Sequence, residues 1–207
     1  AEREYGVPAE VITAFWALES DFGAGITKQS QIFDSLATLA YDCRRPELFS
    51  RELIAAMKII DRGYLTLDRM VGSWAGELGQ TQFLPSHYLN HAIDADGDGR
   101  RDLIRSDPDI IHSTANYIRH LGWRRGEPWL VEVTVPARLD WKEADLDIKH
   151  PVSRWASWGV TRRDGRRLGG NLPAALLLYR PDKPHSAAYY PYTDFSPETQ
   201  AILYALQ

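Results

Sequence analysis

The sequence is short of the features that most readily assign a chain to a class. It holds one cysteine, Cys43, so no disulfide can form within it and cysteine content does not identify the cellular compartment. No apolar run approaches the roughly 20 residues needed to span a bilayer, and no signal peptide is recognisable. The net charge of −4 does not favour nucleic acid as a partner. With 207 residues and no internal repeat, the chain suits one sizeable domain, or one with a small appended lobe.

Aromatic residues and adjacent arginines are, by contrast, plentiful. Seven tryptophans and ten tyrosines supply more aromatic surface than a core of this size needs, and flat amphipathic rings suit sugar stacking as well as ordinary packing. Paired arginines are ordinarily solvated surface, although any pair can instead contact a ligand. The pairs stand at 44–45, 100–101, 124–125, 162–163 and 166–167.

Hydrophobic spacing predicts a helical body followed by a small mixed lobe. The predicted helices are one that begins near Pro8 and ends before Gly23, one over 34–42, one from Pro46 to Gly63 and one from Pro108 to Gly122. After Trp123 the pattern predicts strands over 130–136 and 172–179, a short helix over 152–159, a hairpin turn at Asp164-Gly165 and a terminal helix from Pro197. We therefore expect an α+β, mainly α fold, with residues 1–125 as the core and 126–207 as a small α/β lobe that completes it.

The most specific short pattern is DADGDGRRD, residues 94–102. It has the spacing of an EF-hand loop between two predicted helices, and hard oxygen ligands at this spacing favour Ca²⁺ over Mg²⁺. Arg105 stands where the usual bidentate glutamate is expected, so Asp109 is the candidate for that carboxylate in a longer loop, 94–109. The predicted ligands of this structural site are Asp94, Asp96, Asp98, the Arg100 carbonyl, Asp102 and Asp109. The alternative is a solvated Asp-Gly turn.

Glu19 follows the apolar run VITAFWAL and shares a helix face with Ile12, Phe15 and Trp16. A carboxyl group there would be partly desolvated, which raises its pKa. A carboxylic acid that stays protonated near neutral pH can donate its proton to a glycosidic oxygen. The alternative is an ordinary residue at the end of a helix that meets water.

A second candidate region is GSWAGELGQTQFLPSHY, residues 72–88, which three interrupting glycines predict to be a loop. Ser73, Gln82 and Tyr88 can form hydrogen bonds with hydroxyl and acetamide groups. Trp74 and Phe83 can stack on sugar rings. This composition suits one wall of a saccharide groove.

Five blocks in a fixed order resemble the lytic murein transglycosylase B family: ALESDFG, DSLATLAYDCRR, GSWAGELGQTQFLPSHY, DADGDGRRDL and STANYIRHLGW. The resemblance runs from about Tyr5 to Trp123 and continues more weakly to Tyr179. It implies a lysozyme-like helical catalytic domain that cleaves the β-1,4 bond between N-acetylmuramic acid and N-acetylglucosamine without water. The 1,6-anhydro product then forms with one glutamate, here Glu19, as both acid and base.

The resemblance also implies roles for individual residues and a setting. Ser73, Gln82 and Phe83 would line the groove, and Tyr117 would reach the sugars near Glu19. Arg44 and Arg45 would hold the glycan or its peptide, and Asp109 is supported as a late calcium ligand. It further implies a monomer without organic cofactor that acts on glycan strands in the periplasm of a Gram-negative bacterium, outer-membrane-anchored in a longer form.

Two alternatives stay open beside the transglycosylase: a hydrolase (muramidase), and a catalytically impaired module that binds peptidoglycan. A two-carboxylate hydrolase needs a partner for Glu19. Asp21 points to another side of the helix, and nothing marks Asp42, so the sequence shows no obvious second carboxylate. The impaired module is suggested by the stretch 194–207, which lacks the Tyr-Asn pair and following serine that relatives commonly show and retains only Tyr204 as a partial counterpart.

Overall fold

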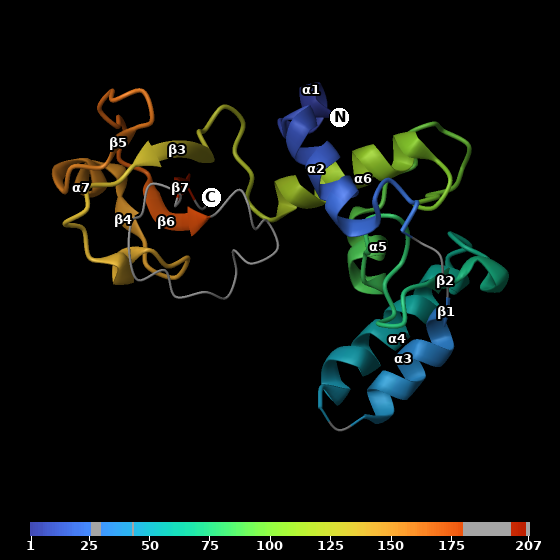
Figure 1. The fold of residues 1–207 in the computed structure, drawn as a ribbon. Coiled ribbons are helices and arrows are strands. Elements are labelled where there is room, and N and C mark those ends of the chain that lie inside the picture. Colours follow the sequence, from blue (N-terminus) through green and yellow to red (C-terminus); the bar gives the residue numbers. More distant parts are fainter. Residues whose placement is uncertain (26–29, 43, 180–199, 206–207) are drawn as a thin grey trace. The chain divides into compact units, whose positions relative to one another are not determined.

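The computed structural model describes residues 1–25, 30–42, 44–179 and 200–205, and it divides into two compact units, 1–125 and 126–207. Helices dominate the first unit, and a sheet with short helical segments forms the second (Figure 1). The predicted mainly α fold is confirmed. No helix in the described ranges is both long enough and apolar enough to cross a bilayer.

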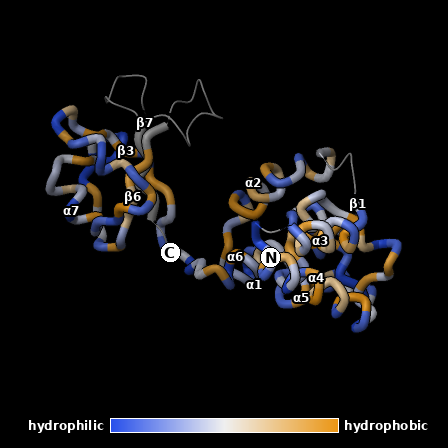
Figure 2. The backbone as a smooth tube through the Cα atoms, turned by 90° about the horizontal axis from the view of Figure 1, so that it is seen from below, coloured by the Kyte–Doolittle hydropathy of each residue, from blue (hydrophilic) through white to orange (hydrophobic). Residues whose placement is uncertain are grey.

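The first unit is built from helices and one very small sheet. Its helices are α1 (Glu2–Tyr5), α2 (Ala9–Ser20), α3 (Ile32–Tyr41), α4 (Pro46–Asp61), α5 (Pro85–His91) and α6 (Asp107–His120), with a short 3-10 helix, η1 (Leu67–Arg69). The strands β1 (Ser30–Gln31) and β2 (Val71–Gly72) pair antiparallel. Hydrophobic and hydrophilic residues alternate along these helices (Figure 2), as expected for helices with one buried face.

Prolines mark the helix starts, because proline lacks the N–H that the first turn leaves without a partner. Pro8 immediately precedes α2, while Pro46 and Pro85 open α4 and α5. At the other end of α2, Asp21 and Phe22 adopt the left-handed conformation, with φ of 49° and 54°. This reversal ends the helix directly after Ser20, so Glu19 lies in its last turn.

Two apolar clusters hold the first unit together. The larger cluster consists of buried residues from helices α3 to α6 and from the segments between them. They are Ile32, Leu36, Ala56, Ile59, Met70, Leu78, Phe83, Tyr88, Ala92, Leu103 and Ile110. The smaller joins α1 and α2 to α6 through Tyr5, Val7, Ile12, Ala115 and Ile118. Both the start of α2 and the loop that follows β2 are therefore anchored in the core.

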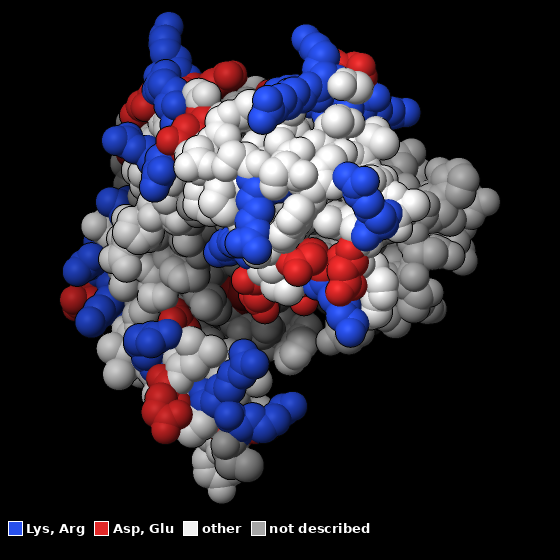
Figure 3. Space-filling view, turned by 90° about the vertical axis from the view of Figure 1, so that its left-hand side faces the viewer, with Lys and Arg blue, Asp and Glu red and all other residues white. Residues whose placement is uncertain are grey.

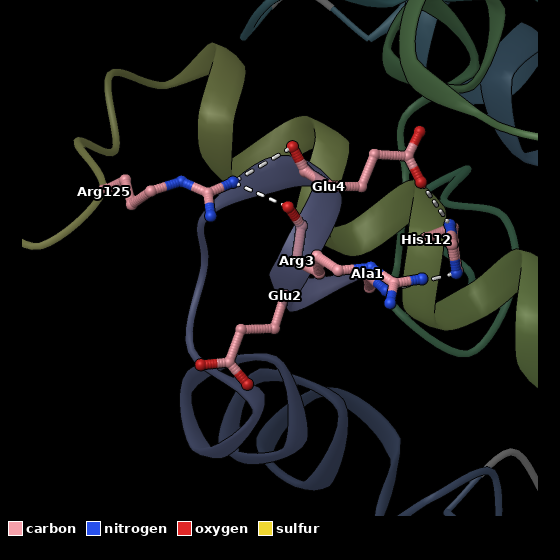
Figure 4. A pocket seen from close by; sticks show the side chains of 6 residues that line it. All are labelled: Ala1, Glu2, Arg3, Glu4, His112 and Arg125. Carbon is pink, nitrogen blue, oxygen red and sulfur yellow. Dashed lines mark hydrogen bonds and ion pairs between the residues drawn. The ribbon is translucent and has the colours of Figure 1, made fainter.

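Polar contacts attach the segment before α2 to α6 and to the residues that follow α6 (Figure 4). His112 of α6 lies 3.5 Å from the Glu4 carboxylate, and Arg125 donates to the carbonyl oxygen of Arg3 at 2.8 Å. These residues border a hollow lined by Ala1, Glu2, Arg3, Glu4, His112 and Arg125. The Trp123 indole donates to the Gly6 carbonyl oxygen at 3.0 Å. The beginning of the helix that carries Glu19 is thus held in place.

The second unit is an antiparallel sheet with short helices, α7 (Val152–Ser157) and the 3-10 helix η2 (Trp141–Glu143). Its strands are β3 (Leu130–Thr134), β4 (His150–Pro151), β5 (Thr161–Arg162), β6 (Pro173–Tyr179) and β7 (Gln200–Ala205), in the spatial order β4-β6-β7-β3-β5. The fully buried Trp155 centres its apolar core and donates its indole N–H to the Ala174 carbonyl oxygen at 2.8 Å. The predicted turn at Asp164-Gly165 is confirmed, with Gly165 at φ 81°.

The predicted terminal helix is wrong for the residues that the structure describes. Pro197 lies outside them, but residues 200–205 form β7 in the middle of the sheet. Its backbone pairs with β6 on one side and β3 on the other. Hydrogen bonds to two neighbouring strands favour the extended form of a short apolar segment, and no local pattern reveals such neighbours.

Candidate active site

Glu19 lies in the last turn of α2 with its side chain exposed to solvent. Protein atoms around the carboxyl group still raise its pKa, chiefly by partial desolvation and secondly through the negative charge of Glu77. This is the direction expected from the sequence. A raised pKa keeps more of the group protonated near neutral pH, as a general acid requires.

Glu77 is a second carboxylate in this region that the sequence interpretation missed. Ser73 donates its hydroxyl to the Glu77 carboxylate at 3.0 Å, and the Ser73 hydroxyl oxygen accepts the backbone N–H groups of Ala75 and Glu77 at 3.2 Å. The sequence shows no obvious second carboxylate beside Glu19 but leaves room for one from elsewhere in the chain, and Glu77 is such a residue. Asp21 and Asp42 are the nearest carboxylates that follow Glu19 along the chain, whereas Glu77 comes from the loop after β2. The useful signal was its position four residues after Ser73 in the same glycine-rich stretch.

The loop over 73–84 is held closely against the core. Leu78 and Phe83 exchange backbone hydrogen bonds of 2.7 and 2.8 Å. Gly79 has φ +75°, and a Cβ added to it would lie 2.5 Å from Cβ of Leu103 and 2.7 Å from the Leu103 carbonyl oxygen. Glycine is thus required at this position for both conformation and space. The predicted loop is thus confirmed over 73–84 as a closely packed segment, whereas residues 85–88 belong to α5.

Two aromatic residues of this loop region do not have the predicted accessibility. Phe83 is only 1% exposed, so it cannot offer its ring face to a sugar; the paired backbone of Leu78 and Phe83 directs the ring into the core. Tyr88 is also 1% exposed and donates its hydroxyl to the Arg101 carbonyl oxygen at 2.8 Å. Trp74, in contrast, is 75% exposed and available for stacking.

Gln82 and Tyr117 keep the accessibility that a binding role needs. Gln82 is half-buried with a left-handed φ of 53°, and its amide donates to the Gly79 carbonyl oxygen at 2.9 Å. Tyr117 of α6 is half-buried, and its ring centroid lies 5.1 Å from that of Phe83. The buried Phe83 therefore supports Tyr117 from within the core. Desolvation raises the pKa of Tyr117, so its hydroxyl stays a hydrogen-bond donor.

Histidines surround the other side of Tyr117. Its ring centroid is 4.8 Å from His87 and 5.3 Å from His91, and His91 lies 4.2 Å from His120. His91 is buried, and its pKa is lowered first by desolvation and then by His120 and His87. The Tyr117 ring of α6 thus packs against the His87 and His91 rings of α5.

Arg44 and Arg45 are exposed at the start of α4. Arg44 forms a bidentate ion pair with Asp42, with nitrogen to oxygen distances of 3.0 Å. The Arg44 backbone N–H also donates to Asp42, at 3.0 Å. Cys43 lies outside the described residues. The ligand-holding role of this pair stays a prediction.

The acidic loop brings together three of its predicted ligands. Carboxylate oxygens of Asp94, Asp96 and Asp109 lie within 4.8 Å of one another, and Asp109 is fully buried. Asp109 accepts the backbone N–H groups of Ala95 and Asp102 at 2.7 Å, which closes the loop at both ends. The late carboxylate suggested by the sequence thus shares one cluster with the first aspartates. Its hard oxygen donors fit Ca²⁺.

The other predicted ligands have different partners. Asp98 accepts the backbone N–H of Arg100 at 2.8 Å, and the role of the Arg100 carbonyl stays a prediction. Asp102 accepts the N–H groups of Ile104 and Arg105, both at 3.0 Å, and its second oxygen lies 3.3 Å from Arg69. The ligand roles of Asp98 and Asp102 likewise stay predictions.

Charged side chains of both signs lie on the surface that the structure describes. Figure 3 shows basic and acidic side chains interspersed over the side of the molecule that it presents. The arginines of the 162–167 hairpin are partly neutralised, since Arg163 pairs with Glu132 at 2.9 Å and Arg166 pairs with Asp164. This agrees with the low net charge of the sequence.

The chain belongs to the family described as the transglycosylase SLT domain, whose model matches residues 1–200. It is 35% identical over 179 residues to the membrane-bound lytic murein transglycosylase B of Escherichia coli (strain K12). The matched region covers 86% of this chain and 48% of that protein. These findings confirm the family indicated by the sequence motifs. The chain spans about half the length of this curated relative.

Solved structures agree with this assignment. SltB3 from Pseudomonas aeruginosa in complex with NAG-NAM-pentapeptide is 36% identical with a TM-score of 0.82, and the match covers 99% of this chain and 51% of that one. The same protein has also been solved with NAG-anhNAM-pentapeptide. The Escherichia coli lytic transglycosylase Slt35 in complex with calcium is 31% identical with a TM-score of 0.77, covering 99% of this chain and 59% of that one.

Proposed function

We propose that this chain is the catalytic part of a lytic transglycosylase that cleaves the β-1,4 bond between N-acetylmuramic acid and N-acetylglucosamine in peptidoglycan. The observation that carries the proposal is Glu19, a carboxyl group of raised pKa in the last turn of α2 and within the electrostatic reach of the loop that holds Ser73 and Glu77. Family membership supports it, as do the two muropeptide complexes of SltB3.

In the proposed mechanism, Glu19 acts twice. The protonated carboxyl group first donates its proton to the glycosidic oxygen, and the bond from that oxygen to the anomeric carbon breaks. The resulting carboxylate then takes the proton of the muramoyl C6 hydroxyl as this oxygen bonds to the anomeric carbon. Glu19 ends protonated again, no water is consumed, and the product carries a 1,6-anhydro ring.

Residues with accessible polar or aromatic groups would bind the glycan. Gln82 and Tyr117 can form hydrogen bonds with hydroxyl and acetamide groups, and the exposed Trp74 can stack on a sugar ring. Ser73 would contact the substrate by exchanging one of its present hydrogen bonds, to Glu77 or Ala75, for a bond to the glycan. Arg44 and Arg45 would contact the glycan or the carboxylates of its peptide.

The acidic loop would hold a structural Ca²⁺. Asp94, Asp96 and Asp109 would supply carboxylate oxygens, and the cation would offset the repulsion between these three neighbouring charges. Slt35 in complex with calcium supports this role. No organic cofactor takes part in the proposed reaction.

A specific observation favours hydrolysis as a second candidate function. Glu77 provides a carboxylate near Glu19, and a pair of carboxylates is what a hydrolytic glycosidase uses to activate water or form a glycosyl-enzyme. Against this role, the Ser73 hydroxyl occupies one oxygen of Glu77. The mass of the product separates the two functions, because the anhydro sugar is one water lighter than the hydrolysed one.

The setting follows from the substrate. Peptidoglycan lies in the bacterial cell envelope, and we propose the periplasm of a Gram-negative bacterium as the site of action of a monomer, anchored to the outer membrane in a longer form. Fractionation of cells that express the protein, with immunodetection in periplasmic and membrane fractions, tests this placement.

Clearing of a suspension of purified peptidoglycan tests the proposed function. Wild-type protein should lower the turbidity, and Glu19→Gln should not. Glu10→Gln provides a matched control, because Glu10 is an exposed glutamate in the first turn of the same helix. Equal clearing by wild type and Glu19→Gln would contradict the role of Glu19, and no clearing by wild type would favour a binding module.

A further inference from the structure

Gln80 forms a two-ended side-chain bridge within the first unit. Its amide oxygen accepts the Trp16 indole N–H at 2.7 Å, and its amide nitrogen donates to the Ile104 carbonyl oxygen at 2.6 Å. Its backbone N–H also donates to the Leu103 carbonyl oxygen at 2.8 Å. One residue of the loop after β2 thus contacts both α2 and the segment that follows the acidic loop.

The chemistry of the partners permits one orientation of the Gln80 amide. An indole N–H can only donate, and a backbone carbonyl can only accept. Rotating the amide by half a turn would place two donors face to face at Trp16 and two acceptors face to face at Ile104. Both bonds therefore specify glutamine: glutamate would keep the acceptor for Trp16 but lose the donor to Ile104.

At one end of the bridge, Gln80 fixes the last turn of the helix of Glu19. Trp16 lies one turn before Glu19 on α2. Gly23, just past the helix end, packs so closely that a Cβ there would lie 2.6 Å from the amide oxygen of Gln80. Ser20 accepts the Gly23 N–H at 3.0 Å, which ties this turn back to the helix. The Gln80 amide therefore lies between the helix and the turn that ends it.

At the other end, Gln80 meets a segment whose position depends on the acidic loop. Asp109 accepts the Asp102 N–H at 2.7 Å, and Asp102 in turn accepts the Ile104 N–H at 3.0 Å. Leu103 is buried and packs on Gly79. The carboxylate cluster is therefore connected to the carbonyl groups that Gln80 binds through two successive hydrogen-bonded residues.

We propose that Gln80 is a positioning residue that couples the acidic loop to the end of α2, and thereby sets the position of Glu19. Order imposed on the loop, as by a bound Ca²⁺, is transmitted from Asp109 and Asp102 to Ile104, then through the Gln80 amide to Trp16. The catalytic consequence rests on the proposed function, since it presumes that Glu19 is the acid and base.

Substitutions that break one link at a time test the coupling. Gln80→Glu replaces the donor to Ile104 by an oxygen and adds a negative charge, and Trp16→Phe removes the indole donor together with part of the ring. Gln31→Glu is the matched control, because Gln31 is an exposed glutamine of β1 in the same unit. Thermal melting of each variant establishes that it is folded at the assay temperature.

Steady-state kinetics on peptidoglycan fragments provide the first readout. Displacement of a catalytic group by about 1 Å can cost about a hundredfold in rate, so kcat of each single variant should fall about ten- to a hundredfold with little change in KM. Because the links act in series, the double variant should be no slower than the worse single one. Losses that multiply, or losses in KM alone, would overturn the proposal.

The Trp16 indole resonance provides a second readout that does not depend on activity. In proton–nitrogen correlation spectra, the Trp16 indole peak is assigned as the one that is missing from the spectrum of Trp16→Phe. Titration with CaCl2 should shift this peak in the wild-type protein and in Gln31→Glu, but not in Gln80→Glu. Two results would overturn the coupling. One is a wild-type Trp16 peak that does not shift although calorimetry shows that calcium binds, and the other is an equal shift of this peak in Gln80→Glu.

The two readouts separate this proposal from the proposed function. Absence of anhydro products from the wild-type protein would contradict the transglycosylase, yet the calcium response of the Trp16 peak would still decide the Gln80 bridge. Normal anhydro products together with an unresponsive Trp16 peak would overturn the bridge alone.

Discussion

At the scale of single residues, the account depends on the protonation of Glu19. Its carboxyl group is accessible to a substrate, yet partial desolvation and the charge of Glu77 hold its pKa above the ordinary value. Replacing the carboxyl group by an amide removes the proton donor without changing the size of the side chain. We predict that Glu19→Gln lowers kcat/KM by about a thousandfold, in the range typical of lost general acid–base catalysis. The rate of muropeptide release measures this loss, and an unchanged melting temperature shows that the fold is retained.

The charge of Glu77 leads to a prediction about pH. The free enzyme needs protonated Glu19, so kcat/KM falls as the pH rises through the pKa of Glu19. Glu77→Gln removes one of the two causes that raise this pKa, and the alkaline limb of the pH–rate profile should move to lower pH. Profiles of kcat/KM for wild type and variant measure the shift. An alkaline limb that stays in place or moves to higher pH would contradict the electrostatic link.

The acidic loop gives a third prediction for one side chain. Asp109→Asn removes a charge from the carboxylate cluster and should weaken calcium binding strongly, as isothermal calorimetry would show. Calcium at a hundred times its Kd should stabilise the wild-type fold by about 2.7 kcal/mol, so the calcium-induced rise in melting temperature should also shrink in the variant. Asp107→Asn is the control, because Asp107 is exposed and outside the cluster. Equal calcium binding by both variants would contradict the assigned site.

At the scale of elements, the loop after β2 carries most of the candidate site, and its close packing makes it sensitive to added volume. Gly79→Ala would place a methyl group against the buried Leu103 and its backbone while demanding a left-handed conformation. We expect a loss of about 2–4 kcal/mol in the free energy of unfolding.

Gly63→Ala separates the two causes of that loss. Gly63 has a similar φ of +70° but no atom within 4 Å of the added Cβ, so its substitution should cost only about 1–2 kcal/mol. Denaturant unfolding of both variants measures the difference. Equal losses would mean that the loop yields to Leu103 and is not tightly packed.

The elements also show what the sequence could and could not reveal. Proline positions and hydrophobic spacing predicted α4 from Pro46 and the apolar strand β6, because these signals are local. Local signals failed where the partner comes from elsewhere in the chain. Glu77 reaches the neighbourhood of Glu19 from another element, β7 is extended because strands flank it, and Phe83 is buried through its backbone pairing with Leu78.

At the scale of the whole molecule, each unit has an apolar cluster of its own among the described residues. The two clusters of the first unit end at Trp123, and that of the second begins at Val131. The sequence-based expectation was that 126–207 completes the core. We instead predict that a fragment of residues 1–125 folds alone, with a helical circular dichroism spectrum and a cooperative melt. A fragment that melts without cooperativity would show that the lobe does complete the core.

The measurement that tests the central claim most directly is mass spectrometry of the muropeptides that the whole chain releases from purified peptidoglycan. Wild type should release products with 1,6-anhydro ends, one water lighter than hydrolysed muropeptides, and Glu19→Gln should release none. Products with reducing ends would contradict the transglycosylase mechanism and indicate that Glu77 activates water. Anhydro products from Glu19→Gln at the wild-type rate would contradict the assignment of the acid and base.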